Sequence, residues 1–497
     1  MKNYKYIGLL LLSIGFASCD VNNELDIIEA EAIPEVALNT NGLDFSTYIS
    51  VGASFTAGYT DGAMFIAAQE NSFPNILAGK FGTEFIQPLM NDNIGGFVYG
   101  GTAVQPPRFY FNGAGPARLP AMPTTELTTV LSGPFHNFGA PGAKSFHLGV
   151  PGYGALNPYF GRMASSPSAS VLGDALATNP TFFTLSEIGG NDVLGYALSG
   201  GTGVDQTGNF DPSSYGGSDI TDPNVFASVF SGMVSALTAN GAKGVVANVP
   251  YITDLANFTT VPYNPVPLDA ATAGAVSSAF AAYNGGIQQA FAYLVAVTPM
   301  TQEMADAEIA KRTISFSAGQ NAVLLVDEYL TDLSAFGIPS YRQSAADDLL
   351  LLASSTVIGT TVGGNPQYIN GVTVPLGDQW VLTPEEQSAI MTATDAYNTT
   401  IAAVASSNPN VALVDFKGVL TEASSGIQFD AYTMTTSLVT GGLVSLDGVH
   451  LTARGYALMA NKILAAADAE FGSNFTSATN GLAKAGDYPT NYSAMLR

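Results

Sequence analysis

The chain has 497 residues and a formal net charge of −24; 47% of its residues are hydrophobic and only 11% are charged. This composition is typical of a folded protein with an ample core, and it excludes an intrinsically disordered chain. The acidic balance argues against a nucleic-acid partner, because binding phosphate groups requires clustered Lys and Arg.

The first eighteen residues predict a signal peptide. Lys2 and Lys5 precede an apolar stretch over 7–16, and two small residues stand directly before Cys19, as they do at a cleavage site. Cys19 is the only cysteine of the chain. Its position resembles that of the lipidated first residue of a mature bacterial lipoprotein, with 1–18 removed. An ordinary secretory signal with an incidental cysteine is the alternative.

A lipid on Cys19 would anchor the protein outside the cytoplasm to a bacterial membrane, and we expect the outer membrane. It would also consume the only thiol, which excludes disulfides, thiolate catalysis and cysteine metal sites. Residues 19–43 begin with an acidic run that lacks a clear period, and they predict a tether. The apolar stretch 271–297 contains Asn and Gln, which favours a buried helix over a membrane span.

Strands and helices alternate in the remaining chain. Short β-rich runs bounded by turn residues predict four strands, at Tyr48–Val51, Phe182–Ser186, Gly244–Asn248 and Val411–Asp415. One helix is expected from Pro223, after the N-cap Asp222, to about 240. Another follows Thr383 and runs to about 406, with Glu386 completing a capping box. This alternation predicts an α/β fold with a parallel sheet, and ligands bind such sheets beyond the carboxyl ends of their strands.

Three segments are expected to be insertions into one domain over 44–470. They span about 91–134, 195–222 and 298–380, and a C-terminal tail is expected at 471–497. Segments of this length are usually binding walls or mobile surface. We expect walls from the first and third, which carry aromatic residues, and surface from the second.

Two motifs carry candidate chemistry. Ser54 follows a predicted strand in a glycine-flanked turn, and a serine at a strand-to-helix corner exposes its hydroxyl at the edge of the sheet. His450 stands three residues after Asp447. At this spacing the carboxylate can fix the tautomer of the imidazole and stabilise its charged form.

Four separated blocks resemble those of the GDSL/SGNH family of serine hydrolases, in the order in which that family has them. They are GASFTAG at 52–58, NFGAPG at 137–142, GGND at 189–192 and DGVH at 447–450. The resemblance covers about 48–467. It implies an α/β, three-layer α/β/α flavodoxin-like SGNH hydrolase fold with a central parallel sheet and large loop insertions.

The resemblance also implies a role for each site residue. Ser54 would be the nucleophile, and Asp447 and His450 would complete the catalytic triad. The backbone N–H groups of Ser54 and Gly142, with the side-chain amide of Asn191, would form the oxyanion hole. No metal or other cofactor is implied. Taken singly, each block has a simpler interpretation, since glycine-rich turns and an aspartate N-cap are common in loops.

One position departs from the family pattern. The family has Asp or Asn before the serine, and this chain has Ala53, so a polar brace of the loop is missing. We expect Asp61 or Asp192 to replace it. Of the other two histidines, neither His136 nor His147 is expected to act as the base.

The leading hypothesis is a membrane-anchored extracytoplasmic serine esterase, lipase-like or acylhydrolase-like, that hydrolyses acyl esters. Its partners would be an acyl-ester small molecule, a lipid or an acetylated glycan, together with the membrane that holds the lipid anchor. Two alternatives stay open. One is a polysaccharide O-deacetylase on the same fold, and the other is an inactive lipoprotein that binds glycan or lipid, a hypothesis motivated by Ala53.

Overall fold

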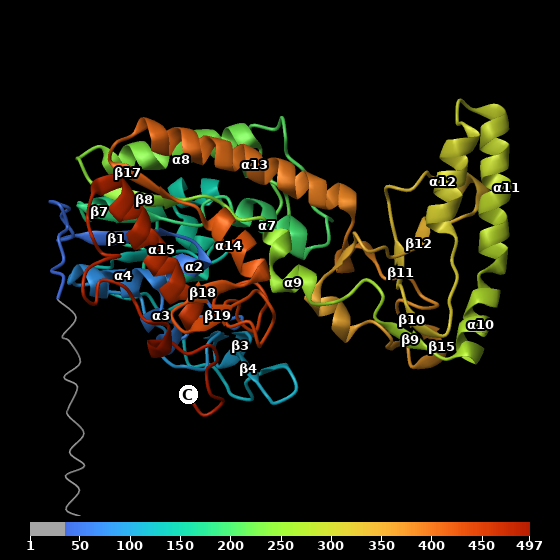
Figure 1. Cartoon of the computed structure of the whole chain (residues 1–497), viewed down its shortest axis with the longest axis horizontal. Coiled ribbons are helices and arrows are strands. Elements are labelled where there is room, and N and C mark those ends of the chain that lie inside the picture. The colour runs from blue at the N-terminus through green and yellow to red at the C-terminus, as the bar shows by residue number, and fades with distance from the viewer. Residues whose placement is uncertain (1–34) are drawn as a thin grey trace, which may run out of the picture. The chain divides into compact units, whose positions relative to one another are not determined.

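The computed structural model describes residues 35–497, so the predicted signal peptide, Cys19 and the first part of the tether lie outside the described residues. The centre of the fold is a five-stranded sheet whose neighbouring strands are all parallel (Figure 1). Its strands are β1 (Tyr48–Gly52), β6 (Asn137–Gly139), β7 (Phe182–Leu185), β8 (Lys243–Ala247) and β17 (Val411–Val414). Four of them were predicted, and the short β6 was not.

The strands follow the order β17-β8-β7-β1-β6 across the sheet. Counted along the chain this is 2-1-3-4-5, one of the two common orders of doubly wound sheets. The order reverses between β1 and β7, and ligands bind such sheets at this point, outside the carboxyl ends of the strands. Ser54 follows β1 there, and Asn191 follows β7.

Helices flank the sheet on both sides, which confirms the predicted α/β class. Figure 1 shows α8 and α13 together on one side of the sheet, with α4 and α15 on the other. The helices of this framework are α2 (Ser54–Ala57), α3 (Ile66–Glu70), α4 (Phe73–Phe81), α5 (Pro158–Gly161), α6 (Val171–Ala177), α7 (Asn191–Leu198), α8 (Pro223–Thr238), α9 (Ala256–Thr259), α13 (Pro384–Ser407), α14 (Phe416–Ser425) and α15 (Ala453–Phe471).

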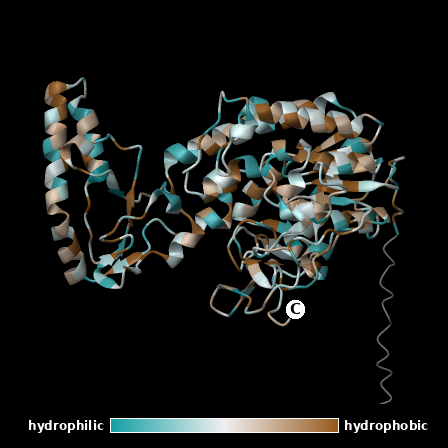
Figure 2. Ribbon diagram, turned by 180° about the vertical axis from the view of Figure 1, so that it is seen from behind, coloured by the Kyte–Doolittle hydropathy of each residue, from teal (hydrophilic) through white to brown (hydrophobic). Residues whose placement is uncertain are grey.

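The two long helices begin where their capping residues predicted. Asp222 accepts hydrogen bonds from the backbone of Asn224 and Val225 at the start of α8. Thr383 and Glu386 form the predicted capping box at the start of α13. Such caps satisfy N–H groups that have no partner within the helix. Figure 2 shows apolar and polar residues interspersed along both helices, as in amphipathic helices that cover a sheet.

The segments between framework elements build small sheets of their own. The first expected insertion holds two hairpins, made of β2 (Phe97–Tyr99), β3 (Thr102–Gln105), β4 (Phe109–Phe111) and β5 (Pro116–Arg118). The second expected insertion, 195–222, begins inside α7 and continues as a loop. The third, 298–380, is part of a longer region that has its own apolar cluster. That cluster starts at Val266, so the inserted region begins earlier in the chain than we expected.

This third region contains helices α10 (Ala270–Ala279), α11 (Ala281–Val297) and α12 (Gln302–Arg312). Its strands are β9 (Val266–Leu268), β10 (Gly319–Asn321), β11 (Leu324–Val326), β12 (Tyr341–Gln343), β13 (Leu349–Leu350), β14 (Thr361–Val362), β15 (Asn365–Ile369) and β16 (Val381–Leu382). The prediction of one buried helix over 271–297 is wrong. A break at Phe280 gives two helices, and each is covered on one side only, so most of their residues are not buried. Among the described residues no helix is long and apolar enough to cross a membrane.

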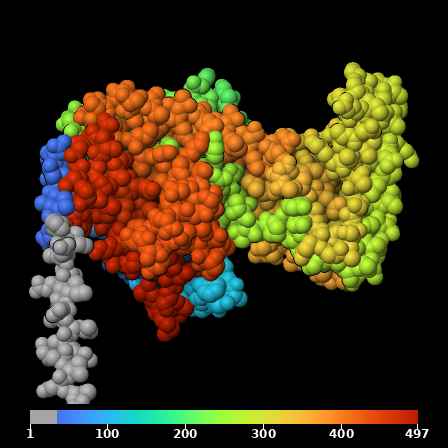
Figure 3. All heavy atoms as spheres, in the orientation of Figure 1, coloured from blue at the N-terminus to red at the C-terminus, as the bar shows by residue number. Residues whose placement is uncertain are grey.

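The C-terminal residues pack against earlier parts of the chain within 38–497. The Asn41 side-chain amide donates to the carbonyl oxygen of Phe471 at 2.7 Å, and Figure 3 shows C-terminal residues, coloured red, on the face turned to the viewer. The Lys80 ammonium group on α4 donates hydrogen bonds to the carbonyl oxygens of Asn480 and Leu482. A hairpin of β18 (Ile427–Phe429) and β19 (Tyr432–Met434) precedes the loop with Asp447 and His450. Hydrogen bonds join this loop to the residues that follow Ser54, so the fold brings the Ser54 turn and the Asp447–His450 loop to one region.

Candidate active site

Ser54 lies at a tight turn between β1 and the short helix α2. Its residue surface is only 8% exposed. The turn depends on glycines that let α2 approach the sheet closely. A Cβ atom on Gly139 of β6 would lie 2.3 Å from the nitrogen of Ala57, and one on Gly52 would lie 2.2 Å from Thr56 Oγ1. The two glycines therefore allow α2 to lie directly across the ends of β1 and β6.

Glu187 braces this turn from the end of β7. Its Oε1 accepts hydrogen bonds from the backbone nitrogens of Ala53 at 2.5 Å and Thr56 at 2.9 Å. Burial raises the pKa of Glu187 to about 7, although the backbone hydrogen bonds oppose the rise. Glu187 also has a positive φ of 53°, and its hydrogen bonds place the side chain against the start of α2. The polar brace that Ala53 cannot supply thus comes from another strand.

Asp447 and His450 form a hydrogen-bonded pair. His450 Nδ1 lies 2.9 Å from Asp447 Oδ2, and the backbone nitrogen of His450 donates to Asp447 Oδ1 at 2.8 Å. Burial alone would raise the pKa of Asp447, but the imidazole and the hydrogen bonds outweigh it and hold this pKa well below its ordinary value. An ionised Asp447 favours the tautomer with hydrogen on Nδ1 and leaves Nε2 free to accept a proton.

The loop after Ser54 is tied to the loop that carries His450. The Gly62 nitrogen donates to Asp447 Oδ2 at 2.7 Å, and Thr60 Oγ1 donates to the Leu451 carbonyl oxygen at 2.7 Å. The ring centroids of Phe55 and Tyr59 lie 5.4 Å and 4.6 Å from that of His450. The structure therefore brings the Ser54 turn and the Asp447–His450 pair together.

Asp61 and Asp192, the expected replacements for the missing brace, have other partners. Asp61 accepts a hydrogen bond from the Leu446 nitrogen, and burial raises its pKa to about 7. Asp192 accepts hydrogen bonds from the nitrogen and hydroxyl of Ser145. The expectation for both residues was wrong, because each side chain points to the loop that packs on it rather than to the Ser54 turn.

Three N–H groups lie on the segments that follow β1, β6 and β7: those of Ser54, Gly142 and the Asn191 side chain. Asn191 donates one side-chain N–H to the carbonyl oxygen of Ala143 at 2.9 Å, which fixes the amide and leaves its second N–H available. Gly142 has a positive φ of 79° with open space beside its Cα. Within the described chain, neither the Gly142 nor the Ser54 backbone N–H donates to a protein acceptor. Free donors of this kind can stabilise negative charge on a ligand oxygen.

Asn137 is a site residue that the sequence did not reveal in this role. Its buried side-chain amide donates to the carbonyl oxygen of Thr56 at 2.8 Å, and its oxygen accepts from the Gly139 nitrogen at 3.0 Å. It therefore joins α2 to the strand beside it. The only sequence signal for this role of Asn137 was its position at the start of the NFGAPG block. The sequence held no signal for Glu187, since nothing in it indicates that this side chain folds back onto α2.

An apolar pocket lies beside Ser54, with a volume of about 930 Å³ that includes its opening to solvent. Its walls come from α14, α15, the segment after β8 and the residues around His450. Examples are Ile252, Leu420, Val449, Leu458 and Met459. None of the lining residues belongs to the three expected insertions, so the prediction that insertions form the apolar wall is wrong for this pocket.

Other candidate groups lie outside this pocket. His136 Nδ1 accepts from the Ile86 nitrogen and His147 Nδ1 accepts from the Lys144 nitrogen, so both rings serve local structure. Among the described residues, one trio of acidic side chains could hold a metal ion, with ligand atoms within 4.8 Å of one another: Glu328, Asp378 and Glu386. None of the trio lines the apolar pocket.

Comparison of the chain with protein-family models, with curated proteins and with solved structures finds no match. The resemblance to GDSL/SGNH hydrolases therefore stays a prediction that depends on the four blocks. The geometry is an independent observation: all four blocks lie near the carboxyl ends of β1, β6 and β7.

Proposed function

We propose that this protein is a serine esterase of the SGNH type that hydrolyses acyl esters, with Ser54 as nucleophile. The observation that carries the proposal is the bonding of the Asp447–His450 pair to the loop that follows Ser54. A hydroxyl, an imidazole and a carboxylate are the groups that acyl transfer through a covalent intermediate requires. The sheet order 2-1-3-4-5, which flavodoxin-like folds share, supports the same assignment.

The proposed reaction has two halves. His450 Nε2 takes the hydroxyl proton as Ser54 Oγ attacks the ester carbonyl carbon, and it returns that proton to the leaving alcohol. A water activated by His450 then releases the acid and restores Ser54. Negative charge on the carbonyl oxygen is stabilised by the N–H groups of Ser54, Gly142 and Asn191. Losing one such donor typically costs ~3–4 kcal/mol of barrier.

The predicted anchor completes the proposal. A lipid on Cys19 and a short acidic tether would hold the enzyme at the surface of a bacterial membrane, outside the cytoplasm, and we expect the outer membrane. The tether carries no part of the site, because the first site residue follows β1. The esterase activity can therefore be measured on the mature chain in detergent.

The test is hydrolysis of p-nitrophenyl acetate and butyrate by the mature protein and by Ser54→Ala. We expect turnover that falls by about 10³-fold or more in the variant, while Ser46→Ala, at an exposed position before β1, keeps it. A fluorophosphonate probe should label the protein at Ser54 alone, as peptide mass spectrometry would report. Turnover that survives Ser54→Ala would reject the nucleophile.

The alternatives predict different outcomes. A polysaccharide O-deacetylase would release acetate from acetylated glycan faster than it cleaves any p-nitrophenyl ester. An inactive binder would show no turnover and no fluorophosphonate labelling. The Glu187 brace opposes the argument that Ala53 signals lost activity, because it supplies the hydrogen-bond acceptor that the alanine lacks.

A further inference from the structure

The apolar pocket beside Ser54 has a composition that selects one kind of ligand. We propose that it binds the acyl chain of the substrate, so that the enzyme prefers medium-chain and long-chain acyl esters to acetyl esters. This inference depends on the proposed esterase function and names the substrate class of the same site.

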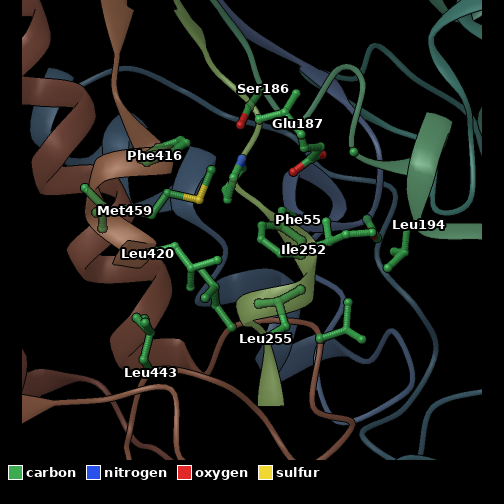
Figure 4. A pocket seen from close by; sticks show the side chains of 18 of the residues that line it. Phe55, Ser186, Glu187, Leu194, Ile252, Leu255, Phe416, Leu420, Leu443 and Met459 are labelled. Carbon is green, nitrogen blue, oxygen red and sulfur yellow. The ribbon is translucent and has the colours of Figure 1, made fainter. Parts of the chain in front are cut away.

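One end of the pocket lies near the nucleophile. Ser54, Asn191, Ser186 and Glu187 all line the pocket, and Glu187 accepts a hydrogen bond from the nitrogen of Ala53, directly before Ser54. Figure 4 shows Ser186 and Glu187 at one end and Leu255 at the other. An ester whose carbonyl carbon lies at Ser54 would have its carbonyl oxygen near the Asn191 amide, and a chain attached to it would extend over apolar side chains.

The chain in the pocket is the acyl part rather than the alcohol. His450 must face the leaving oxygen to return the proton. Val449 and Leu451, on either side of His450, line the pocket, but His450 itself does not. The imidazole therefore serves another side of Ser54, and the alcohol leaves there. The group that enters the apolar pocket is the one that stays on the serine.

The deeper lining offers little to a sugar. Phe416 and Leu420 of α14 and Met459 of α15 line one side of the pocket in Figure 4, with Ile252 and Leu194 toward the other. Asn248, another polar lining residue, donates one N–H to Asp415 and accepts from the backbone nitrogen of Lys417, so only its second N–H is left for a ligand. Sugar hydroxyls buried here would lose water and gain few partners, which is unfavourable. Methylene groups would gain from the same burial.

The apolar lining and the size of the pocket determine how kcat/KM should change with acyl-chain length. Each methylene that leaves water raises kcat/KM by about fourfold, the equivalent of ~0.8 kcal/mol, until the pocket is full. An acetyl group would leave nearly all of the space unused. The activity should therefore rise steeply from acetate through butyrate to octanoate, and then level off when the chain outgrows the pocket.

The experiment compares p-nitrophenyl acetate, butyrate, octanoate and laurate with the mature protein and two matched variants. Val419→Phe places a larger side chain in the pocket from α14, at a half-buried position that can accept it. Thr421→Phe adds the same ring on the exposed side of that helix. We expect Val419→Phe to lower kcat/KM for octanoate and laurate by about tenfold or more, with acetate little changed and Thr421→Phe like the parent.

Binding without turnover gives a second readout. Ser54→Ala should bind the fluorescent fatty acid cis-parinaric acid, and the double variant Ser54→Ala/Val419→Phe should bind it much more weakly. Ethyl acetate and octyl acetate test the opposite assignment. A preference for octyl acetate that Val419→Phe abolishes would show that the pocket takes the alcohol, and the proposal would be wrong.

The outcomes separate the two proposals. If no ester is cleaved and Ser54 is not labelled, the esterase function fails. If acetate is cleaved as well as octanoate, or Val419→Phe lowers all esters alike, the esterase stands and the acyl pocket is overturned. Parinaric acid binding that is unchanged in the double variant would also overturn it.

Discussion

Three carboxyl groups, buried or half-buried, bind the loops that carry Ser54 and His450, and their surroundings give them different protonation. The pKa of Asp447 is held well below its ordinary value, whereas burial raises those of Glu187 and Asp61 to about 7. Asp447 is therefore ionised near neutral pH. Glu187 and Asp61 are partly protonated near neutral pH, and each accepts hydrogen bonds from the backbone that shapes the site.

Asp447→Asn tests the role of the ionised carboxylate. Asp447 Oδ2 accepts from both Gly62 and His450, and an amide nitrogen at that position would face two donors. The imidazole would lose the tautomer that frees Nε2, so we expect kcat to fall by about 10⁴-fold. Steady-state kinetics with p-nitrophenyl butyrate would measure the loss.

The control for this substitution is Asp269→Asn, which changes an exposed N-cap of α10 in the inserted region. Asparagine caps a helix as well as aspartate does, so kcat should stay unchanged. If Asp447→Asn kept most of the parent activity while His450→Ala lost it, Asp447 would serve only to hold the loop.

Glu187 is expected to be a positioning residue. Glu187→Ala would leave the nitrogens of Ala53 and Thr56 buried without an acceptor, at ~1–3 kcal/mol each, and would release the turn. We expect kcat for p-nitrophenyl acetate to fall by about 100-fold, as for other small misplacements of reacting groups. Glu187→Gln keeps an acceptor oxygen and should restore kcat to near the parent value. Equal losses in both variants would contradict the positioning role.

The chemistry-bearing residues were easier to predict than the residues that hold them. The structure brings Ser54, Asp447, His450, Gly142 and Asn191 into one region, and each stands in a short block with unusual residues. Glu187 and Asn137 were missed in their supporting roles. These roles arise from a backbone turn and from strand pairing, neither of which a local pattern encodes.

At the scale of elements, the approach of α2 to the sheet decides where the serine lies. Gly139→Ala would place a Cβ atom 2.3 Å from the nitrogen of Ala57, so α2 must shift. We expect a loss of ~1–3 kcal/mol in unfolding free energy, as for other overpacked sites, together with a fall in kcat. Urea unfolding and ester hydrolysis would measure the two effects.

Gly79→Ala is the matched control for this element. Gly79 lies inside α4, and a Cβ atom there has open space. The substitution should stabilise the protein by ~0.5–1 kcal/mol, because glycine is a poor helix former, and leave kcat unchanged. A Gly139→Ala variant with parent stability and kcat would show that the close approach does not matter.

Element prediction succeeded where local signals were strong. The caps at Asp222 and Thr383 predicted the start of α8 and α13, and β-rich runs predicted four of the five strands. The strand β6 was missed, because Asn137–Gly139 has three residues and little β-propensity. An apolar wall was predicted, but from the insertions, which do not line the pocket. Its walls come from elements far apart in the sequence, and each apolar residue alone is typical of a core.

At the scale of the whole molecule, four buried or half-buried carboxyl groups share one direction of pKa shift. Burial raises the pKa of Asp378 to about 7 and that of Glu386 to about 8, in addition to the rises at Asp61 and Glu187. In an unfolded chain such groups release their protons near pH ~4. The folded protein therefore binds more protons than the unfolded chain does between pH ~4 and ~8, and these protons link stability to pH.

Raised carboxyl pKa values make the folded protein less stable as pH rises. The contribution of these groups to the unfolding free energy is fully present below their unfolded pKa and is lost as pH rises toward about 8. Asp447, with its lowered pKa, acts in the opposite direction but only in strong acid. We expect Tm to fall by a few degrees between about pH 5.5 and about pH 8. Differential scanning calorimetry in buffers of equal ionic strength would measure it.

Glu386→Gln should flatten this dependence. Glu386 is fully buried, and its Oε2 accepts from the Thr383 nitrogen, a bond that the glutamine oxygen can keep. The variant no longer has to bury a carboxylate at high pH, so its Tm should exceed that of the parent near pH 8 and match it near pH 5.5. Glu385→Gln, at the exposed neighbouring position, should follow the parent at both values. A parent Tm that rises across this interval would contradict the raised pKa values, because folding would then favour the ionised carboxyl groups.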